Sequence, residues 1–266
     1  MPPRFKKLLR TAQISFPFLL DVKFSVMRWY RRRRGIVFDR DFEGIRHFPV
    51  ADGALFLDVG GNRGQSTDAI LMIAPNARVQ MFEPNPLLCK KIRAQFGGDR
   101  RLTINECGLG NAVGELPLHV PFYKNWMFDG LASFNPEDAC GWLNEDRVYF
   151  YKPERITVQE VTCSVKRLDD LGLVPFFIKL DVQGYEYEVL RGGERTLRAH
   201  EPVLLIESPP TPEIVAFLRG IGYEFFTFRD NQFLPGVVES NNTFFMTSRA
   251  ASSVAQSIKR APVAMA

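Results

Sequence analysis

The stretch LFLDVGGNRG, residues 55–64, decides the fold of this 266-residue chain. Its apolar half, Leu55–Val59, runs into two glycines and therefore predicts a short buried strand. A helical pattern follows over Gln65–Ile73 and stops near Pro75. Where a strand turns through glycines into a helix, free backbone N–H groups gather in one place, so this loop is expected to hold a ligand.

Strand and helix patterns continue to alternate along the chain. Further strands are predicted at 78–82, 102–105, 176–180, 203–206, 224–228 and 243–247, and helices at 86–96, 185–190 and 211–219. This alternation predicts a three-layer α/β domain with helices on both faces of a mostly parallel sheet. We assign residues 51–247 to that domain.

Residues 111–165 interrupt the alternation. Added strands are predicted at 116–120 and 156–161, and the segment 121–153 is rich in aromatic residues. A long insertion inside a compact domain is usually functional, so this one is expected to cover a substrate cleft. The alternative is a hairpin that packs its aromatic side chains on a core of its own.

The basic character of the chain belongs to its two ends. Net charge is +4, but residues 1–34 hold ten Lys/Arg and one acid, and residues 248–266 hold three Lys/Arg and no acid. The remaining 35–247 segment carries 21 basic and 29 acidic residues. A nucleic-acid-binding domain would carry its basic face on the folded body, so we expect no nucleic-acid partner.

The two ends are interpreted separately from the domain. Residues 1–50 are predicted to be a basic helical extension, with four consecutive arginines at Arg31–Arg34, and 248–266 a flexible tail. Residues 1–34 suit peripheral contact with an anionic membrane or an acidic partner, or equally a solvated helical cap. The apolar run Ile14–Leu20 contains Pro17 and lacks a cleavage site, which argues against secretion. We expect a cytoplasmic protein, peripheral to the inner face of the membrane if these residues bind it.

Two acids accompany the glycine loop. Asp58 ends the first strand and Glu83 ends the second. The loop does not fit the dinucleotide pattern G-x-G-x-x-G, because the two residues that should be glycine after Gly60 are Asn62 and Gln65. Asp58 would repel a pyrophosphate and attract an ammonium group. A carboxylate at Glu83 can accept both hydroxyls of a ribose. We therefore predict a nucleoside site that includes the loop residues Gly60, Asn62 and Gly64.

Acids also end the later strands. Glu106 follows the third strand, where it could contact an adenine or a ribose, and Glu207 ends the strand 203–206. Lys179 and Asp181 alternate with apolar residues, so they share one face of a strand end. Ligands of open α/β sheets bind at the carboxyl ends of the strands, which brings Asp181 to the predicted site. Glu186 is interpreted as a helix cap.

The motifs together resemble the FkbM family of methyltransferases. The strongest match is IKLDVQG at 178–184, leading to Glu186 and to LRGG at 190–193. The other matching stretches lie in the family's order at 56–67, 81–84, 106–111, 165–171 and 204–207. The sequence is thereby identified as similar to this family over about 150 residues.

The resemblance implies a Rossmann-like methyltransferase fold of seven strands with an antiparallel one at the end. It implies S-adenosylmethionine as cofactor and methyl transfer, usually to a hydroxyl of a sugar, glycolipid or natural product. Gly60 and Glu83 match the family's cofactor positions and Asp181 its fourth-strand acid. Gln183 departs from the pattern, because the family commonly has glutamate there.

Methyl transfer to oxygen requires a group that takes the hydroxyl proton. We expect Asp181 to orient or deprotonate the acceptor with Lys179 tuning its charge, and Glu207 is a second candidate. Asp181 is also expected to contact the cofactor. His47 and His119 lie outside the motifs and are interpreted as structural. The four cysteines form no C-x-x-C pair, so no structural zinc site is predicted. Asp181, Glu186 and Glu207 could surround a cation, but no spacing requires a metal, so no metal ligand is assigned. A nicotinamide-dependent oxidoreductase and a non-catalytic cofactor-binding or membrane-associated module remain alternatives.

Overall fold

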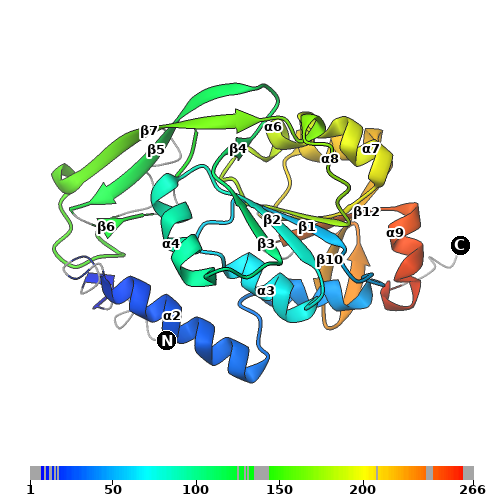
Figure 1. Ribbon diagram of the computed structural model, residues 1–266, viewed down its shortest axis with the longest axis horizontal. Helices are drawn as coiled ribbons and strands as arrows, with labels where there is room; N and C mark the ends of the chain where they lie inside the picture. The colour runs from blue at the N-terminus through cyan, green and yellow to red at the C-terminus, as the bar shows by residue number, and fades with distance from the viewer. Residues whose placement is uncertain are drawn as a thin grey trace, which may run out of the picture.

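The computed structural model describes residues 7–8, 10–11, 14, 16, 18–124, 126–128, 130, 132–134, 144–207, 209–237 and 242–259. Its centre is an eight-stranded sheet (Figure 1). The strands lie in the order β11 (Gln232–Pro235), β10 (Tyr223–Arg229), β12 (Asn242–Thr247), β9 (Val203–Glu207), β8 (Phe177–Leu180), β1 (Leu55–Val59), β2 (Arg78–Phe82) and β3 (Leu102–Asn105).

The pairing directions confirm a mostly parallel sheet. Strands β9, β8, β1, β2 and β3 pair in parallel, and β12 runs antiparallel between β9 and β10. The predicted strands of this sheet are all present, with ends within one residue of the expected ones. The expectation of seven strands was one short, because β10 turns back through Asp230 and Asn231 into β11. Both turn residues have positive φ, the backbone of a tight hairpin turn.

Helices cover both faces of the sheet, which confirms the three-layer architecture. On one face α3 (Gln65–Ile73) and α4 (Pro86–Phe96) pack on a core that contains Phe56, Phe177 and Leu205. On the other face α6 (Glu186–Arg191), α7 (Glu194–His200) and α8 (Pro212–Gly220) pack on Leu57 and Ile178. Alternate residues of one strand thus enter opposite cores, as a strand buried on both faces requires.

The insertion builds a second sheet beside the first (Figure 1). Its order is β4 (Gly108–Leu109), β7 (Ile156–Lys166), β5 (Gly114–Tyr123) and β6 (Trp126–Met127). Strands β5 and β7 pair antiparallel over ten residues each, so both extend well past the strands predicted at 116–120 and 156–161. Trp142, one of the aromatic residues that define the insertion, lies outside the described residues.

Both ends of the chain are attached to the domain. Helix α2 (Phe18–Arg34) lies along α3, and the 3₁₀ helix η1 (Arg40–His47) places Phe42 in the core at 0% exposure. The prediction of a flexible tail at 248–266 was wrong for residues 248–259. This segment forms α9 (Ser248–Ser253), buries Val254 completely and pairs Ile258 with Phe233. Apolar side chains of the segment dock on the first core, which overrides its small-residue composition.

The end of α6 at Gly192 lies in close contact with the backbone of Gly110, which follows β4 of the second sheet. A Cβ built on Gly192 would lie 1.9 Å from the carbonyl oxygen of Gly110. The φ of Gly192 is −73°, an ordinary helical value, so a side chain there is excluded by space and not by backbone strain. Helix α6 can therefore end against this loop only if residue 192 lacks a side chain.

We predict that Gly192→Ala lowers the free energy of unfolding by at least about 2 kcal/mol, since overpacking against backbone cannot relax locally. The matched control is Gly220→Ala at the end of α8, where a Cβ meets nothing within 4 Å. Alanine favours the helix there, so that variant should be neutral or more stable by up to about 1 kcal/mol. Urea unfolding of both variants measures the difference, and equal stabilities would contradict the packing argument.

Candidate active site

A pocket opens where the first strands of the large sheet end. It contains about 590 Å³ of space, counting its open mouth. One wall is formed by Gly60 and Asn62 of the loop after β1, by Glu83 after β2 and by Asp181 after β8. The opposite wall comes from the insertion, through Gly130 and residues 132–134.

The glycines of the loop serve contacts within the protein. Gly60 has φ +81°, and a Cβ there would lie 1.7 Å from the carbonyl oxygen of Asp181. A Cβ on Gly61 would overlap the side chain of Met81, and one on Gly64 would lie 2.5 Å from the Phe96 ring. The close approach expected for a ligand is therefore made by the chain itself. Gly64 lies behind the pocket and is not part of its lining.

Glu83 and Asn62 present oxygen atoms to the pocket. The Glu83 carboxylate is 5% exposed and accepts hydrogen bonds from the backbone N–H of Asn62 (2.8 Å) and of Asn85 (2.9 Å). These bonds use one lone pair of each carboxylate oxygen. The side-chain oxygen of Asn62 is buried and has no hydrogen-bond partner. Hydrogen-bond acceptors held in this way fit a ligand that carries hydroxyl or amino donors.

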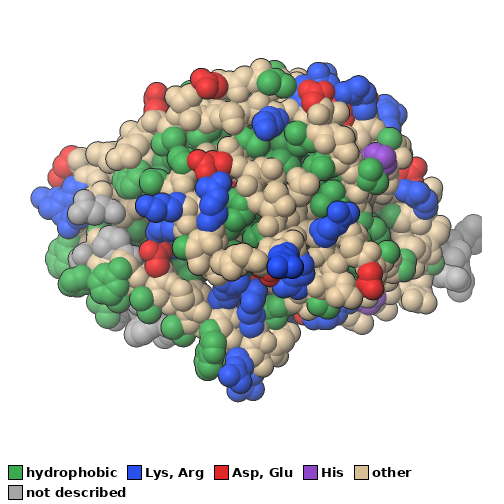
Figure 2. All heavy atoms as spheres, in the orientation of Figure 1, with side chains coloured by type: hydrophobic (Ala, Val, Ile, Leu, Met, Phe, Trp, Pro, Cys, Tyr) green, Lys and Arg blue, Asp and Glu red, His purple; other side chains and the backbone are tan. Residues whose placement is uncertain are grey.

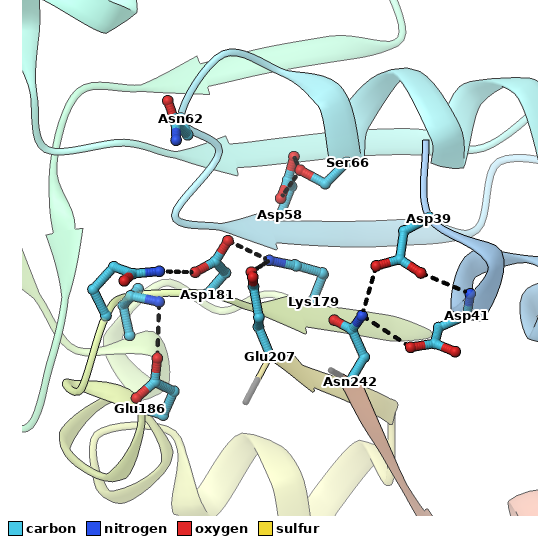
Figure 3. Close-up of polar contacts among 12 residues, drawn as sticks. Asp39, Asp41, Asp58, Asn62, Ser66, Lys179, Asp181, Glu186, Glu207 and Asn242 are labelled. Atoms are coloured by element: carbon cyan, nitrogen blue, oxygen red, sulfur yellow. Dashed lines mark hydrogen bonds and ion pairs between the residues drawn. The ribbon is translucent and has the colours of Figure 1, made fainter. Parts of the chain in front are cut away.

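Asp58 does not face the pocket, contrary to its predicted contact with a cofactor ammonium. It is completely buried and accepts hydrogen bonds from the hydroxyl groups of Ser66 (2.7 Å, Figure 3) and Thr67 (2.6 Å) in the first turn of α3. Burial raises the pKa of Asp58, against the opposing charge of Lys179 and these hydroxyl donors. Its place in the fold is to hold the start of α3 to the end of β1.

Glu106 also lies outside the pocket lining. Its carboxylate forms an ion pair with Arg93 of α4 at 2.6 Å, on the surface. The motif that follows the third strand still reaches the pocket, through Gly108 and Leu109 of β4. We expected Glu106 to contact the ligand, but Gly108 and Leu109 of the same motif line the pocket instead.

A buried lysine joins Asp181 of the pocket lining to Glu207, and neither the lysine nor Glu207 lines the pocket itself. Lys179 on β8 is 2% exposed, and its ammonium lies 2.9 Å from Asp181 and 3.4 Å from Glu207 (Figure 3). Asp58 stands beside Lys179 on the neighbouring strand β1. Three strands thus bring three carboxylates around one cation. The sequence prediction that Lys179 and Asp181 share a face is confirmed, and Glu207 joins them.

The pKa values of Asp181 and Glu207 shift in opposite directions within this cluster. Burial would raise the pKa of Asp181, but the Lys179 ammonium and hydrogen bonds from its neighbours hold it below the ordinary value. Burial and the hydrogen-bonded Asp181 carboxylate raise the pKa of Glu207 to about 8. Burial would lower the pKa of Lys179, but the surrounding carboxylates raise it. At neutral pH Lys179 and Asp181 are charged and Glu207 holds a proton.

Side-chain hydrogen bonds fix the loop after β8. The Gln183 amide donates a hydrogen bond to the Asp181 carboxylate at 2.8 Å, and the Ser133 hydroxyl donates to the Gln183 carbonyl at 3.1 Å. Glu186 accepts hydrogen bonds from the backbone N–H groups of Val182 and Gly184, both at 3.0 Å, so its role is structural, but it holds the loop before α6 and does not cap the helix as expected. Sequence reasoning missed Ser133, because only its place in the insertion pointed toward the site.

The remaining candidates take structural positions. The ring nitrogens of His47 are bonded to Ser257 at 2.7 Å and to Asn231 at 3.1 Å, on η1 away from the pocket. His119 on β5 lies 3.7 Å from Glu160. Within the described ranges the cysteines are free and buried, and no group of three or more His, Cys, Asp or Glu side chains is arranged to hold a metal ion.

Two curated proteins similar to this chain carry methyltransferase names. The 2-O-methyltransferase NoeI of Sinorhizobium fredii is 27% identical over 150 residues, covering 54% of this chain and 58% of its own. Methyltransferase 1 of Beauveria bassiana is 29% identical over 153 residues, covering 54% and 60%. The chain thus spans about 60% of the length of these curated relatives.

Among solved structures, a methyltransferase FkbM of Methylobacillus flagellatus aligns with 74% of this chain and 44% of its own. Its sequence identity is 17% and its TM-score 0.47. The methyltransferase FkbM domain, as a family, matches residues 58–225. That match starts at Asp58, includes Lys179, Asp181 and Glu207, and covers more than half of the sequence. The chain therefore belongs to the FkbM methyltransferase family.

Proposed function

We propose that this chain is an S-adenosylmethionine-dependent O-methyltransferase acting on a hydroxyl of a sugar, glycolipid or natural product. One observation carries the proposal: a single pocket joins the oxygen acceptors of Glu83 and Asn62 to the carboxyl of Asp181, which is paired with Glu207 outside the pocket lining. The first pair suits a nucleoside, and the second suits removal of a hydroxyl proton. The name of one relative, a 2-O-methyltransferase, points to the same kind of acceptor.

The pocket residues fit the cofactor that the family implies. S-adenosylmethionine supplies a methyl group activated by a sulfonium centre. In our proposal Glu83 accepts hydrogen bonds from ribose hydroxyls, because its carboxylate is already oriented by the N–H groups of Asn62 and Asn85. The unpartnered side-chain oxygen of Asn62 accepts a bond from a ligand amino group. Apolar side chains of Phe82 and Leu109 provide the surface for an aromatic base.

Asp181 and Glu207 act as one proton-accepting unit. Asp181 is ionised and accepts a hydrogen bond from the acceptor hydroxyl, while Lys179 keeps that carboxylate charged. Lys179 therefore acts on the acceptor through Asp181. The hydroxyl proton passes to the pair, whose titration belongs to both groups together. Ionisation of Glu207 near pH 8 gives the pair its full capacity as a base.

The insertion is proposed to cover the acceptor. Ser133 and Phe134 line the pocket, and Ser133 is bonded to the loop that carries Asp181. Phe134 also contacts the Tyr185 ring edge-on at 5.2 Å, next to the same loop. These contacts favour the cover over a hairpin that packs only on itself. A closed site excludes water from the reacting groups.

The proposal is tested by incubating the protein with S-adenosylmethionine labelled in its methyl group and an extract of cells that make the acceptor. We expect label in a small molecule or glycan, in a linkage that resists mild alkali as an ether does. A label released by alkali as a methyl ester, or found on nitrogen, would contradict methylation of a hydroxyl. A sample without the protein controls for other methyltransferases in the extract.

Asp181→Asn should lower kcat on the acceptor so identified by about 100-fold or more, the usual contribution of a proton-accepting side chain. S-adenosylmethionine should still raise the melting temperature, since Glu83 and Asn62 remain. Asp170→Asn, at an exposed acid with surface ion pairs, is the matched control and should keep full activity. Near-normal kcat in Asp181→Asn with the cofactor bound would remove Asp181 from the mechanism.

The pH dependence of kcat/KM should report Glu207. Because the pKa of Glu207 is raised to about 8, the group is protonated below that pH and ionised above it. The rate should therefore rise with pH and level off above about pH 8. Glu207→Gln cannot ionise, so its profile should lack this rise and stay low. The same rise in Glu207→Gln would show that another group is the one titrating.

A further inference from the structure

The exposed apolar side chains of this molecule gather at its N-terminal end. Of the fourteen large hydrophobic residues that are exposed among the described residues, nine lie between Leu8 and Ile36. Four of them, Phe18, Val22, Val26 and Trp29, follow one another along α2 at spacings of four, four and three. Such spacing places them on one face of the helix, which we call the outer face of α2.

Ion pairs on a neighbouring side of α2 fix the helix to the domain. Arg28 and Arg32 bind Asp68 of α3 at 3.0 and 2.6 Å. Asp21 binds Arg63 of the glycine loop at 2.6 Å. Arg28 also covers the ring of Phe96 in α4, 4.0 Å from its centroid. The helix is therefore fixed to the domain, and the outer face cannot turn inward to hide its apolar residues.

Basic residues border the outer face. Lys23 and the arginines of the last turn of α2 flank it, with Arg33 5.7 Å from the centre of the Trp29 ring and Arg34 at the same distance from Tyr30. The one acid among residues 1–34 is Asp21, which Arg63 and Lys91 already occupy. Figure 2 shows hydrophobic and basic side chains side by side along the lower edge, where Figure 1 places α2.

We propose that the outer face of α2 docks in the plane of an anionic lipid membrane. An apolar stripe with tryptophan and tyrosine, bordered by arginines, is the arrangement of helices that lie at the lipid interface. Within the described residues no helix is long and apolar enough to cross a membrane, so α2 would lie on it. A second copy would bring two sets of arginines together, and their repulsion disfavours that occupant.

Docking of α2 on a membrane would place the membrane next to a helix that is ion-paired with the loop after β1. Arg63, which holds α2 through Asp21, directly follows Asn62 of the pocket lining. The guanidinium of Arg63 also lies 4.7 Å from the ring centre of Phe24 on α2. This inference does not depend on the proposed reaction, because it rests on the surface of α2 alone.

The test is co-sedimentation of the full chain with vesicles of phosphatidylcholine alone, or of equal parts phosphatidylcholine and phosphatidylglycerol. We expect binding to the anionic vesicles only. The double variant Val26→Asn/Trp29→Gln should weaken it about tenfold or more, through loss of buried apolar area. The control Val113→Asn/Val174→Asn changes two side chains that are equally exposed elsewhere and should bind like wild type.

Charge is tested with Arg33→Gln/Arg34→Gln, which should weaken binding about 25-fold, since each basic residue near an anionic surface contributes about a factor of five. Lys166→Gln/Lys259→Gln removes the same charge away from α2 and should have little effect. Equal binding by wild type and Val26→Asn/Trp29→Gln would overturn the proposal, and so would equal binding to both kinds of vesicle. A dimer in light scattering that Val26→Asn/Trp29→Gln abolishes would assign the face to self-association.

Discussion

The site depends on one buried cation. Lys179 stands in the middle strand of a parallel sheet at 2% exposure, where an unpaired ammonium would cost several kcal/mol. Asp58, Asp181 and Glu207, on β1, after β8 and at the end of β9, surround it. Burial and the ionised Asp181 carboxylate keep a proton on Glu207 and raise its pKa to about 8. The carboxylates that make the lysine tolerable in the core thereby also include an ionised one, Asp181, in the pocket lining.

Close backbone packing keeps that cluster beside the ligand pocket. The chain passes so near itself at Gly60 that the loop after β1 and the loop after β8 touch through the Asp181 carbonyl. Any displacement of one loop therefore moves the other. The same glycine loop holds α2 through Arg63, and the insertion holds the β8 loop through Ser133. Fold, pocket and N-terminal helix are consequently parts of one connected packing arrangement, even though the segments lie far apart in the sequence.

Features that depend on the local sequence pattern could be predicted from the sequence. Strand and helix periods predicted the sheet, and alternation placed Lys179 and Asp181 on one face. It could not tell which way an acid at a strand end points. Asp58 faces Ser66 and Thr67 instead of the pocket, and Glu106 faces Arg93, because their partners come from the helices α3 and α4. It also could not show that Ser133 meets Gln183, or that Asp68 fixes α2, since those contacts join residues about 35 to 50 positions apart.

Family membership favours a methyl donor over the nicotinamide cofactor that the glycine spacing already disfavours. The central claim, that the pocket beside Lys179 is the methyl-donor site, is tested most directly by calorimetric titration of S-adenosylmethionine into three proteins. We expect wild type and Glu106→Ala to bind equally, because Glu106 lies outside the pocket, and Glu83→Ala to bind at least about tenfold more weakly, as loss of charged hydrogen bonds implies. Weakened binding in Glu106→Ala with unchanged binding in Glu83→Ala would contradict it, as would tight binding of NAD in place of S-adenosylmethionine.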